Sequence, residues 1–166
     1  PENLAKSPLS ANLGAKGLVV WCALNEHASP FEQFAVLRKA VQILLDEHPE
    51  QVDLLILGTP EFRQQACETA AYVALANGTA LPDHKQKHRD PLLEHVRLWG
   101  SPAPVRAPVL AEANLLARTF TALPPNILTP QAYRERLASL ANDLGWEREE
   151  YNLEQLRDMG AGAFLA

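Results

Sequence analysis

The sequence is poor in the features that mark secreted and membrane proteins. Its 166 residues include two cysteines, too few for a disulfide framework, so Cys22 in an apolar run and Cys67 in a helical pattern are predicted to be buried free thiols. Free thiols suit a reducing cytoplasm. No apolar segment approaches the roughly 20 residues that cross a bilayer, and the opening segment PENLAKSPLS has no signal-peptide core. We therefore expect a cytoplasmic protein with no membrane partner.

A strong excess of charge is also missing. The formal net charge is −5, and dividing the chain at Pro108 gives 10 basic and 12 acidic residues before it and 5 basic and 8 acidic residues after it. The two parts thus carry −2 and −3. Neither part offers an attractive field to a phosphate backbone, which disfavours nucleic acid as a partner.

Local signatures of catalysis are absent as well. The glycines are scattered, with no fingerprint for cradling a phosphate. No serine or cysteine stands in a nucleophile-elbow pattern, and the aspartates are dispersed rather than clustered. The sequence therefore assigns no catalytic, metal-binding or cofactor-binding residue in this chain.

What the sequence does contain is an alternation of strand and helix patterns. Residues 17–24 and Val52 to Leu57 are continuous apolar runs of strand length, typical of strands covered on both faces. Ser29-Pro30 and Thr59-Pro60 each open a helix, with a capping residue before a proline at the first helical position. Short connections between such elements predict an α/β sandwich with a mostly parallel sheet.

The rest of the first hundred residues is patterned less strongly. Residues 1–16 are expected to be irregular or partly extended. Ala80 and Leu81 are a candidate start of a further strand, and residues 94–99 alternate as a half-exposed strand does. Gly100 to Pro104, with two prolines in three residues, is the best candidate for a linker.

The last third of the chain predicts two further helices, the second of them short. Thr129-Pro130 opens one, on which Tyr133, Leu137, Leu140 and Leu144 form a single stripe closed by Gly145. Asn152 with Gln155 is a capping-box pattern for another. Gly160-Ala161-Gly162 then breaks that helix before the apolar run of residues 163–166.

Three segments in this region resemble one family. They are Asn114 to Arg118 (NLLAR), Leu123 to Pro130 (LPPNILTP) and Met159 to Leu165 (MGAGAFL), and their order and spacing are similar to the leucyl aminopeptidases, the two-metal M17 peptidases. The family usually has Gly-Met-Gly-Ala before its strand, whereas here Met159 precedes Gly160-Ala161-Gly162. The match lies where the family's N-terminal domain meets its catalytic domain.

The resemblance implies an architecture. Residues 1–108 would be an N-terminal α/β domain similar to macro domains, residues 109–123 a linker helix, and residues 124–166 the truncated start of the catalytic domain. The chain does not begin with Met, so its true start is also expected to lie upstream.

The resemblance also implies an activity. Members of the family are cytoplasmic hexamers that remove N-terminal amino acids from peptides. They use two divalent metal ions, Zn or Mn, held by carboxylates and a lysine. Their signature Asn-Thr-Asp-Ala-Glu-Gly-Arg does not occur in this sequence. The chain alone is therefore expected to be inactive and to bind no metal cofactor.

One loop contains candidate metal ligands that are suggested by the residues themselves, independently of the family resemblance. His84 and His88, with Asp83 and Asp90 nearby, have metal-binding spacing if they lie on a helix. Their proline-bounded, lysine-rich setting favours a solvated loop instead. Lys85, Lys87 and Arg89 in the same loop could contact an anion or an acidic partner surface, although such a cluster is usually only solvated.

Two alternatives to a peptidase region stay open. The chain could be a free-standing α/β module that binds a small ligand such as a nucleotide, or a domain that builds an oligomer. The stripe from Tyr133 to Leu144 would otherwise rest on a catalytic sheet, so we expect it to pack against the N-terminal domain or another copy of the chain.

Overall fold

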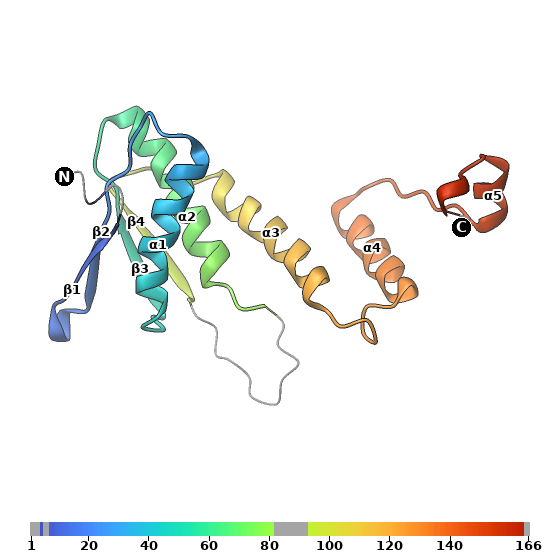
Figure 1. The fold of residues 1–166 in the computed structure, drawn as a ribbon, viewed down its shortest axis with the longest axis horizontal. Helices are drawn as coiled ribbons and strands as arrows, with labels where there is room; N and C mark the ends of the chain where they lie inside the picture. The colour runs from blue at the N-terminus through green and yellow to red at the C-terminus, as the bar shows by residue number, and fades with distance from the viewer. Residues whose placement is uncertain (1–3, 5–6, 82–92, 165–166) are drawn as a thin grey trace. The chain divides into compact units, whose positions relative to one another are not determined.

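The computed structural model describes residue 4, residues 7–81 and residues 93–164. Within these residues the chain divides into two units, Pro1–Ala122 and Leu123–Ala166. The first unit combines helices and small sheets, and the second is built from helices (Figure 1). The mixed α/β class predicted from the sequence is confirmed.

The first two helices begin at the prolines that the sequence indicates. Helix α1 (Pro30–Leu45) has a complete capping box, in which the Ser29 hydroxyl accepts from the backbone N–H of Glu32 and the Glu32 carboxylate accepts from the backbone N–H of Ser29 at 2.8 Å. Helix α2 (Pro60–Gly78) also starts with proline, but the Thr59 side chain makes no capping hydrogen bond. Pro60 therefore marks this helix start more reliably than the hydroxyl before it does.

The strands form two pairs in the described residues rather than one mostly parallel sheet. β1 (Leu9–Asn12) pairs antiparallel with β2 (Leu18–Trp21), and β3 (Gln51–Leu55) pairs parallel with β4 (His95–Trp99). The parallel prediction is thus correct for β3 and β4 and wrong for β2. A turn through the short 3₁₀ helix Gly14–Lys16 brings β2 back onto β1, using the positive φ of Gly14 and Gly17.

Two local predictions also need correction. Residues 9–12, expected to be irregular or partly extended, form a regular strand because they pair with the apolar run that follows. Ala80 and Leu81 belong to no strand. Helix α2 occupies the chain through Gly78, which leaves these two residues in an irregular connection.

The run from Val52 to Leu57 is covered on one face only. Val52 is buried, and Leu54 and Ile56 are half-buried against the helices. Leu55 and Leu57 point the other way and are 64% and 77% exposed. The prediction of a strand buried on both faces is wrong, because successive side chains alternate and only one face packs on helices.

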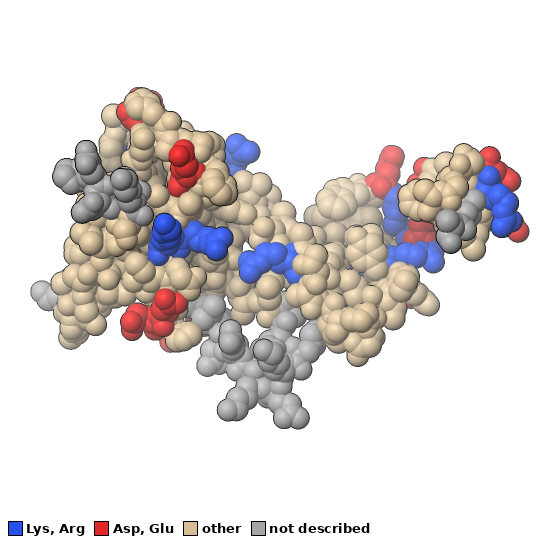
Figure 2. All heavy atoms as spheres, viewed as in Figure 1, with Lys and Arg blue, Asp and Glu red and all other residues tan. Residues whose placement is uncertain are grey.

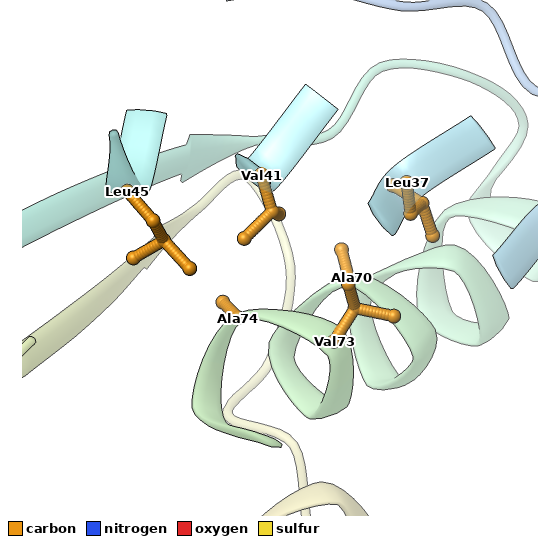
Figure 3. Close-up of a cluster of buried hydrophobic side chains, with 6 residues drawn as sticks. All are labelled: Leu37, Val41, Leu45, Ala70, Val73 and Ala74. Carbon is orange, nitrogen blue, oxygen red and sulfur yellow. The ribbon is translucent and has the colours of Figure 1, made fainter. Parts of the chain in front are cut away.

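The core lies between α1 and α2. Leu37, Val41 and Leu45 follow one face of α1 and point at small residues of α2, as Figure 3 shows. Ala70 and Ala74 let the two helices approach closely, and Val73 fills the remaining space. Half-buried Leu54, Ile56 and Val96 of the β3–β4 side pack against this cluster.

Helix α3 (Arg106–Ala122) packs along α2 and belongs to the first unit. The sequence predicts a linker helix over residues 109–123, so the observed helix begins three residues earlier. Gly100 has a φ of +78°, and residues 100–105 are irregular. The assignment of residues 1–108, 109–123 and 124–166 to separate domains stays a prediction.

The second unit confirms the predicted caps. Helix α4 (Pro130–Leu144) has the Thr129 hydroxyl accepting from the Ala132 N–H at 3.2 Å and ends at Gly145 in the left-handed conformation. Helix α5 (Leu153–Asp158) has the predicted capping box of Asn152 and Gln155. A 3₁₀ turn, Gly162–Phe164, follows.

Candidate functional site

A groove runs between α1, α2 and α3 of the first unit and consists of two adjoining hollows. Both are lined by Phe34 of α1, Tyr72 of α2 and Asn114 of α3. We call the larger one, of about 790 Å³, the Glu68 hollow, and the smaller one, of about 530 Å³, the basic hollow. Both volumes lie in the range of small-molecule sites, roughly 300–1,000 Å³.

An aromatic pair forms the shared wall of the hollows. The rings of Phe34 and Tyr72 meet edge to face, with centroids 5.6 Å apart and an interplanar angle of 89°. This arrangement is favourable because the positive edge of one ring faces the negative face of the other. The contact joins a ring of α1 to a ring of α2, so the wall that the two hollows share is apolar.

Glu68 of α2 fixes the position of α3. Its carboxylate accepts from the backbone N–H of Val105 at 2.7 Å and of Ala107 at 2.8 Å, and it also accepts from Arg106 N–H. A side chain from a neighbouring helix thus satisfies the free N–H groups that a capping residue ordinarily serves. The wall of the groove formed by α3 is thereby tied to α2.

The same contacts shift the ionisation of Glu68. Partial desolvation works to raise the pKa, but the backbone N–H donations from Val105, Ala107 and Arg106, with the charge of Arg106, outweigh it and lower the pKa below the usual 4.5. The group is therefore a fixed carboxylate at neutral pH. It is a structural anion rather than a proton donor.

The basic hollow has a different character. Arg38 and Lys39 of α1 and Arg118 of α3 line it, and no acidic residue does. Arg118 donates from its guanidinium to the Ala76 carbonyl near the end of α2. None of the three cations forms an ion pair in the described part of the chain. Figure 2 shows Lys and Arg atoms over α1 and α3 on this face.

The outward face of β3 and β4 carries a separate polar cluster. Asp53 on β3 lies opposite Arg97 on β4 and accepts from its Nε at 2.7 Å, from a terminal guanidinium nitrogen at 2.9 Å and from Trp99 Nε1 at 2.9 Å. These donors, Arg97 first, lower the pKa of Asp53 to about 2. The Arg97 guanidinium also lies 5.9 Å from the Trp99 ring centroid. The charges of Asp53 and Arg97 therefore compensate each other within the cluster.

The candidate ligands named from the sequence lie outside the described residues. His84, His88, Asp83 and Asp90, and with them Lys85, Lys87 and Arg89, all fall within 82–92. Across the described ranges, 7–81 and 93–164, no group of three or more His, Cys, Asp or Glu is arranged to hold a metal. In the same ranges no helix is long and apolar enough to cross a membrane.

The residues of the groove were not identified from the sequence. Phe31, Phe34 and Arg38 are spaced three or four apart along α1, with Lys39 next to Arg38, which is a sequence signal for a mixed aromatic and basic helix face. Asn114 and Arg118 were singled out only as the ends of the NLLAR segment, without a binding role, and Glu68 carries no sequence signal. Their roles depend on the packing of α2 and α3, which residue spacing does not disclose.

Comparison with known proteins finds similar sequences that carry the same name, cytosol aminopeptidase. No family model matches the chain. It is 42% identical over 60 residues to a probable cytosol aminopeptidase of Synechococcus, which is 36% of this chain and 12% of that protein. A probable cytosol aminopeptidase of Methylorubrum populi is 38% identical over 60 residues with the same coverage. The matched segment therefore spans about an eighth of these relatives, 12%.

A solved structure extends the similarity to the fold. A tomato leucine aminopeptidase mutant superposes with a TM-score of 0.71 at 16% identity, over 93% of this chain and 34% of that one. At this identity the likeness concerns the fold alone. The mixed α/β arrangement is thus one that occurs within a leucine aminopeptidase.

Proposed function

Because the chain is similar to the leucyl aminopeptidases, we propose that it is the N-terminal region of an exopeptidase that removes N-terminal amino acids from peptides. The observation that carries this proposal is the agreement of two comparisons, 42% identity to a probable cytosol aminopeptidase and a TM-score of 0.71 to a leucine aminopeptidase. The resemblance of NLLAR, LPPNILTP and MGAGAFL supports it from the residues.

The proposed division follows the family. Residues 1–108 would form the N-terminal domain, residues 109–123 a linker helix, and residues 124–166 the first elements of the catalytic domain. The separation of unit Leu123–Ala166 from the first unit supports the second boundary. The packing of α3 on α2 indicates that the linker helix is anchored to the N-terminal domain rather than free.

The second unit exposes an unusual amount of apolar surface. Tyr133 and Leu144 of the predicted stripe are 42% and 53% exposed. Others exposed in this unit are Trp146, Tyr151, Leu153, Met159 and Phe164. Apolar surface of this extent is expected to be covered in the working protein. Further catalytic-domain chain would cover it in the proposed enzyme.

The two metals of the family would be held elsewhere in the longer protein. The described residues do not fit them, since they hold no suitable cluster of carboxylate, imidazole or thiolate ligands. The signature Asn-Thr-Asp-Ala-Glu-Gly-Arg is also missing from the sequence. We therefore propose that this chain supplies no catalytic or metal-binding residue and is inactive alone.

Location and assembly follow the same reasoning. The relatives are named cytosol aminopeptidases, so we propose a cytoplasmic enzyme that acts on peptides, uses zinc or manganese, and assembles as a homo-oligomer, a hexamer by analogy with the family.

The test compares the 166-residue chain with the longer gene product. Each is incubated with manganese or zinc and a leucine-terminated peptide, and released leucine is measured. We expect release by the longer protein, loss of release with a chelator, and no release by the chain alone. Trimming by the chain alone, or a longer protein inactive with both metals and a panel of N-terminal residues, would contradict the proposal.

A second candidate function is a ligand-binding module, which the groove between α1, α2 and α3 favours. An oligomer-building role remains the third reading. Sedimentation of the chain and of the longer protein tests this role. An assembly domain is expected to form oligomers by itself, and a strictly monomeric chain would count against the role.

A further inference from the structure

The basic hollow combines uncompensated positive charge with exposed aromatic surface. Arg38, Lys39 and Arg118 line it, no acidic side chain does, and none of these cations has an ion-pair partner among the described residues. This occurs in a chain whose net charge is −5. Cations gathered from two helices without carboxylates are more costly than dispersed ones unless an anion joins them.

One of the cations is held in place. The Arg118 guanidinium donates to the Ala76 carbonyl, so its remaining N–H groups are directed by that contact. A guanidinium fork is suited to the oxygens of a phosphate, with which it forms paired, charge-assisted hydrogen bonds. Arg38 and Lys39 are exposed on α1 and can adjust to the same anion.

Aromatic rings lie beside the cations. Phe31, at the first turn of α1, lines the hollow and is 82% exposed. Phe34 and Tyr72 form the wall next to it. Asn114 also lines the hollow, and its amide makes no hydrogen bond within the described residues. The hollow therefore offers ring surface, the Asn114 amide and three cations within about 530 Å³.

We propose that the basic hollow binds a small ligand in which a phosphate group is joined to a planar ring. The phosphate is held by Arg38, Lys39 and Arg118, and the ring lies against Phe31 and the Phe34–Tyr72 wall. A nucleoside monophosphate has this chemistry and a suitable size. A long nucleic acid is disfavoured, because the adjoining Glu68 hollow carries Glu61 and Glu68 and the chain is acidic as a whole.

This proposal goes beyond the peptidase assignment and does not depend on it. The ligand site lies wholly in the first unit, whereas the proposed catalytic machinery lies in a longer protein. Binding to the 166-residue chain and peptide release by the longer protein are separate measurements, so either proposal can fail alone.

The binding test uses isothermal titration calorimetry of the 166-residue chain with three probes. Adenosine monophosphate carries both parts of the ligand, adenosine the ring alone and inorganic phosphate the anion alone. We expect saturable 1:1 binding of the monophosphate, at least about tenfold weaker binding of each part, and weakening with added salt. Absence of saturable binding of the monophosphate, or equal binding of adenosine, overturns the proposal, as does tighter binding of a single-stranded oligonucleotide.

Variants locate the site. The double variant Arg38→Gln/Lys39→Gln removes two exposed cations. We expect its affinity for the monophosphate to be at least about tenfold lower, because hydrogen bonds to charged groups are stronger than those between neutral groups. Phe31→Ala is expected to lower the affinity for the monophosphate but not the affinity for inorganic phosphate, because it removes only the ring contact. Arg136→Gln, on exposed α4, is the matched control and should change nothing. Circular dichroism verifies the fold of each variant, and an unchanged affinity in the folded double variant overturns the assignment.

Discussion

The contact between Glu68 and the start of α3 can be tested by a single substitution. Glu68→Ala removes the acceptor of the Val105, Arg106 and Ala107 N–H groups, whose shortest distances are 2.7 and 2.8 Å. No other acceptor is recorded for these donors within the described residues. We expect α3 to loosen from α2 and the free energy of unfolding to fall.

The size of the loss follows from helix capping and the helix dipole. Removing a capping side chain costs about 1 kcal/mol, and a carboxylate at a helix N-terminus contributes about 0.3–1 kcal/mol more. We expect Glu68→Ala to lose about 1.5 kcal/mol, which corresponds to roughly 3–6 °C in Tm for a chain of this length. Glu68→Gln keeps one oxygen acceptor and should lose about half as much.

The assay is urea unfolding followed by circular dichroism, with Glu112→Ala on the exposed side of α3 as the matched control. The pKa of Glu68 is lowered in the folded state, so its stabilisation is fully present above the usual pKa of 4.5 and is lost as the pH falls through the lower folded-state pKa. The difference between wild type and Glu68→Ala should therefore shrink in acid. If Glu68→Ala is as stable as Glu112→Ala at pH 7, Glu68 does not anchor α3.

Three further predictions concern the rest of the first unit. In a carboxyl NMR titration Asp53 should ionise near pH 2, and Arg97→Gln should raise that pKa; a pKa near 3.8 in the wild type would contradict the cluster. Since both side chains are about half exposed, losing the pair should cost little stability, and that small contribution is present above pH 4 and lost in acid. Leu45→Ala should lose about 2–5 kcal/mol in urea unfolding because it empties part of the core, and a loss below 1 kcal/mol would place Leu45 outside it. Gly78→Ala places a Cβ 2.7 Å from Leu93 and should cost about 1–3 kcal/mol, whereas a thermal melt unchanged from wild type would show that this contact is loose.

Helix boundaries were predictable because their causes are local. Ser29, Thr129 and Asn152 accept from N–H groups three residues ahead, and Gly145 ends α4 in the left-handed conformation. These hydrogen bonds depend on neighbouring residues alone. The same is true of the buried face of α1, where Leu37, Val41 and Leu45 recur at helical spacing.

The pairing of strands was not predictable from the apolar runs. The run that contains β2 suits a buried parallel strand, yet β2 pairs with β1 across a turn, and the alternating burial of β3 leaves Leu55 exposed. An apolar run indicates a strand but not its neighbour. For β2 the neighbour is set by the turn at Gly14 and Gly17, and for β3 it is β4, a strand far along the chain, so neither partner can be read from the run itself.

The sequence by itself determined where α1, α2, α4 and α5 start, that the class is α/β, and that NLLAR, LPPNILTP and MGAGAFL stand in the order typical of leucyl aminopeptidases, because each is carried by residues close together in the chain. Only the tertiary structure decided that Glu68 caps α3 and that Arg38, Lys39 and Arg118 share one hollow. The physical reason is that these groups come from different helices, and their meeting depends on how α1, α2 and α3 pack.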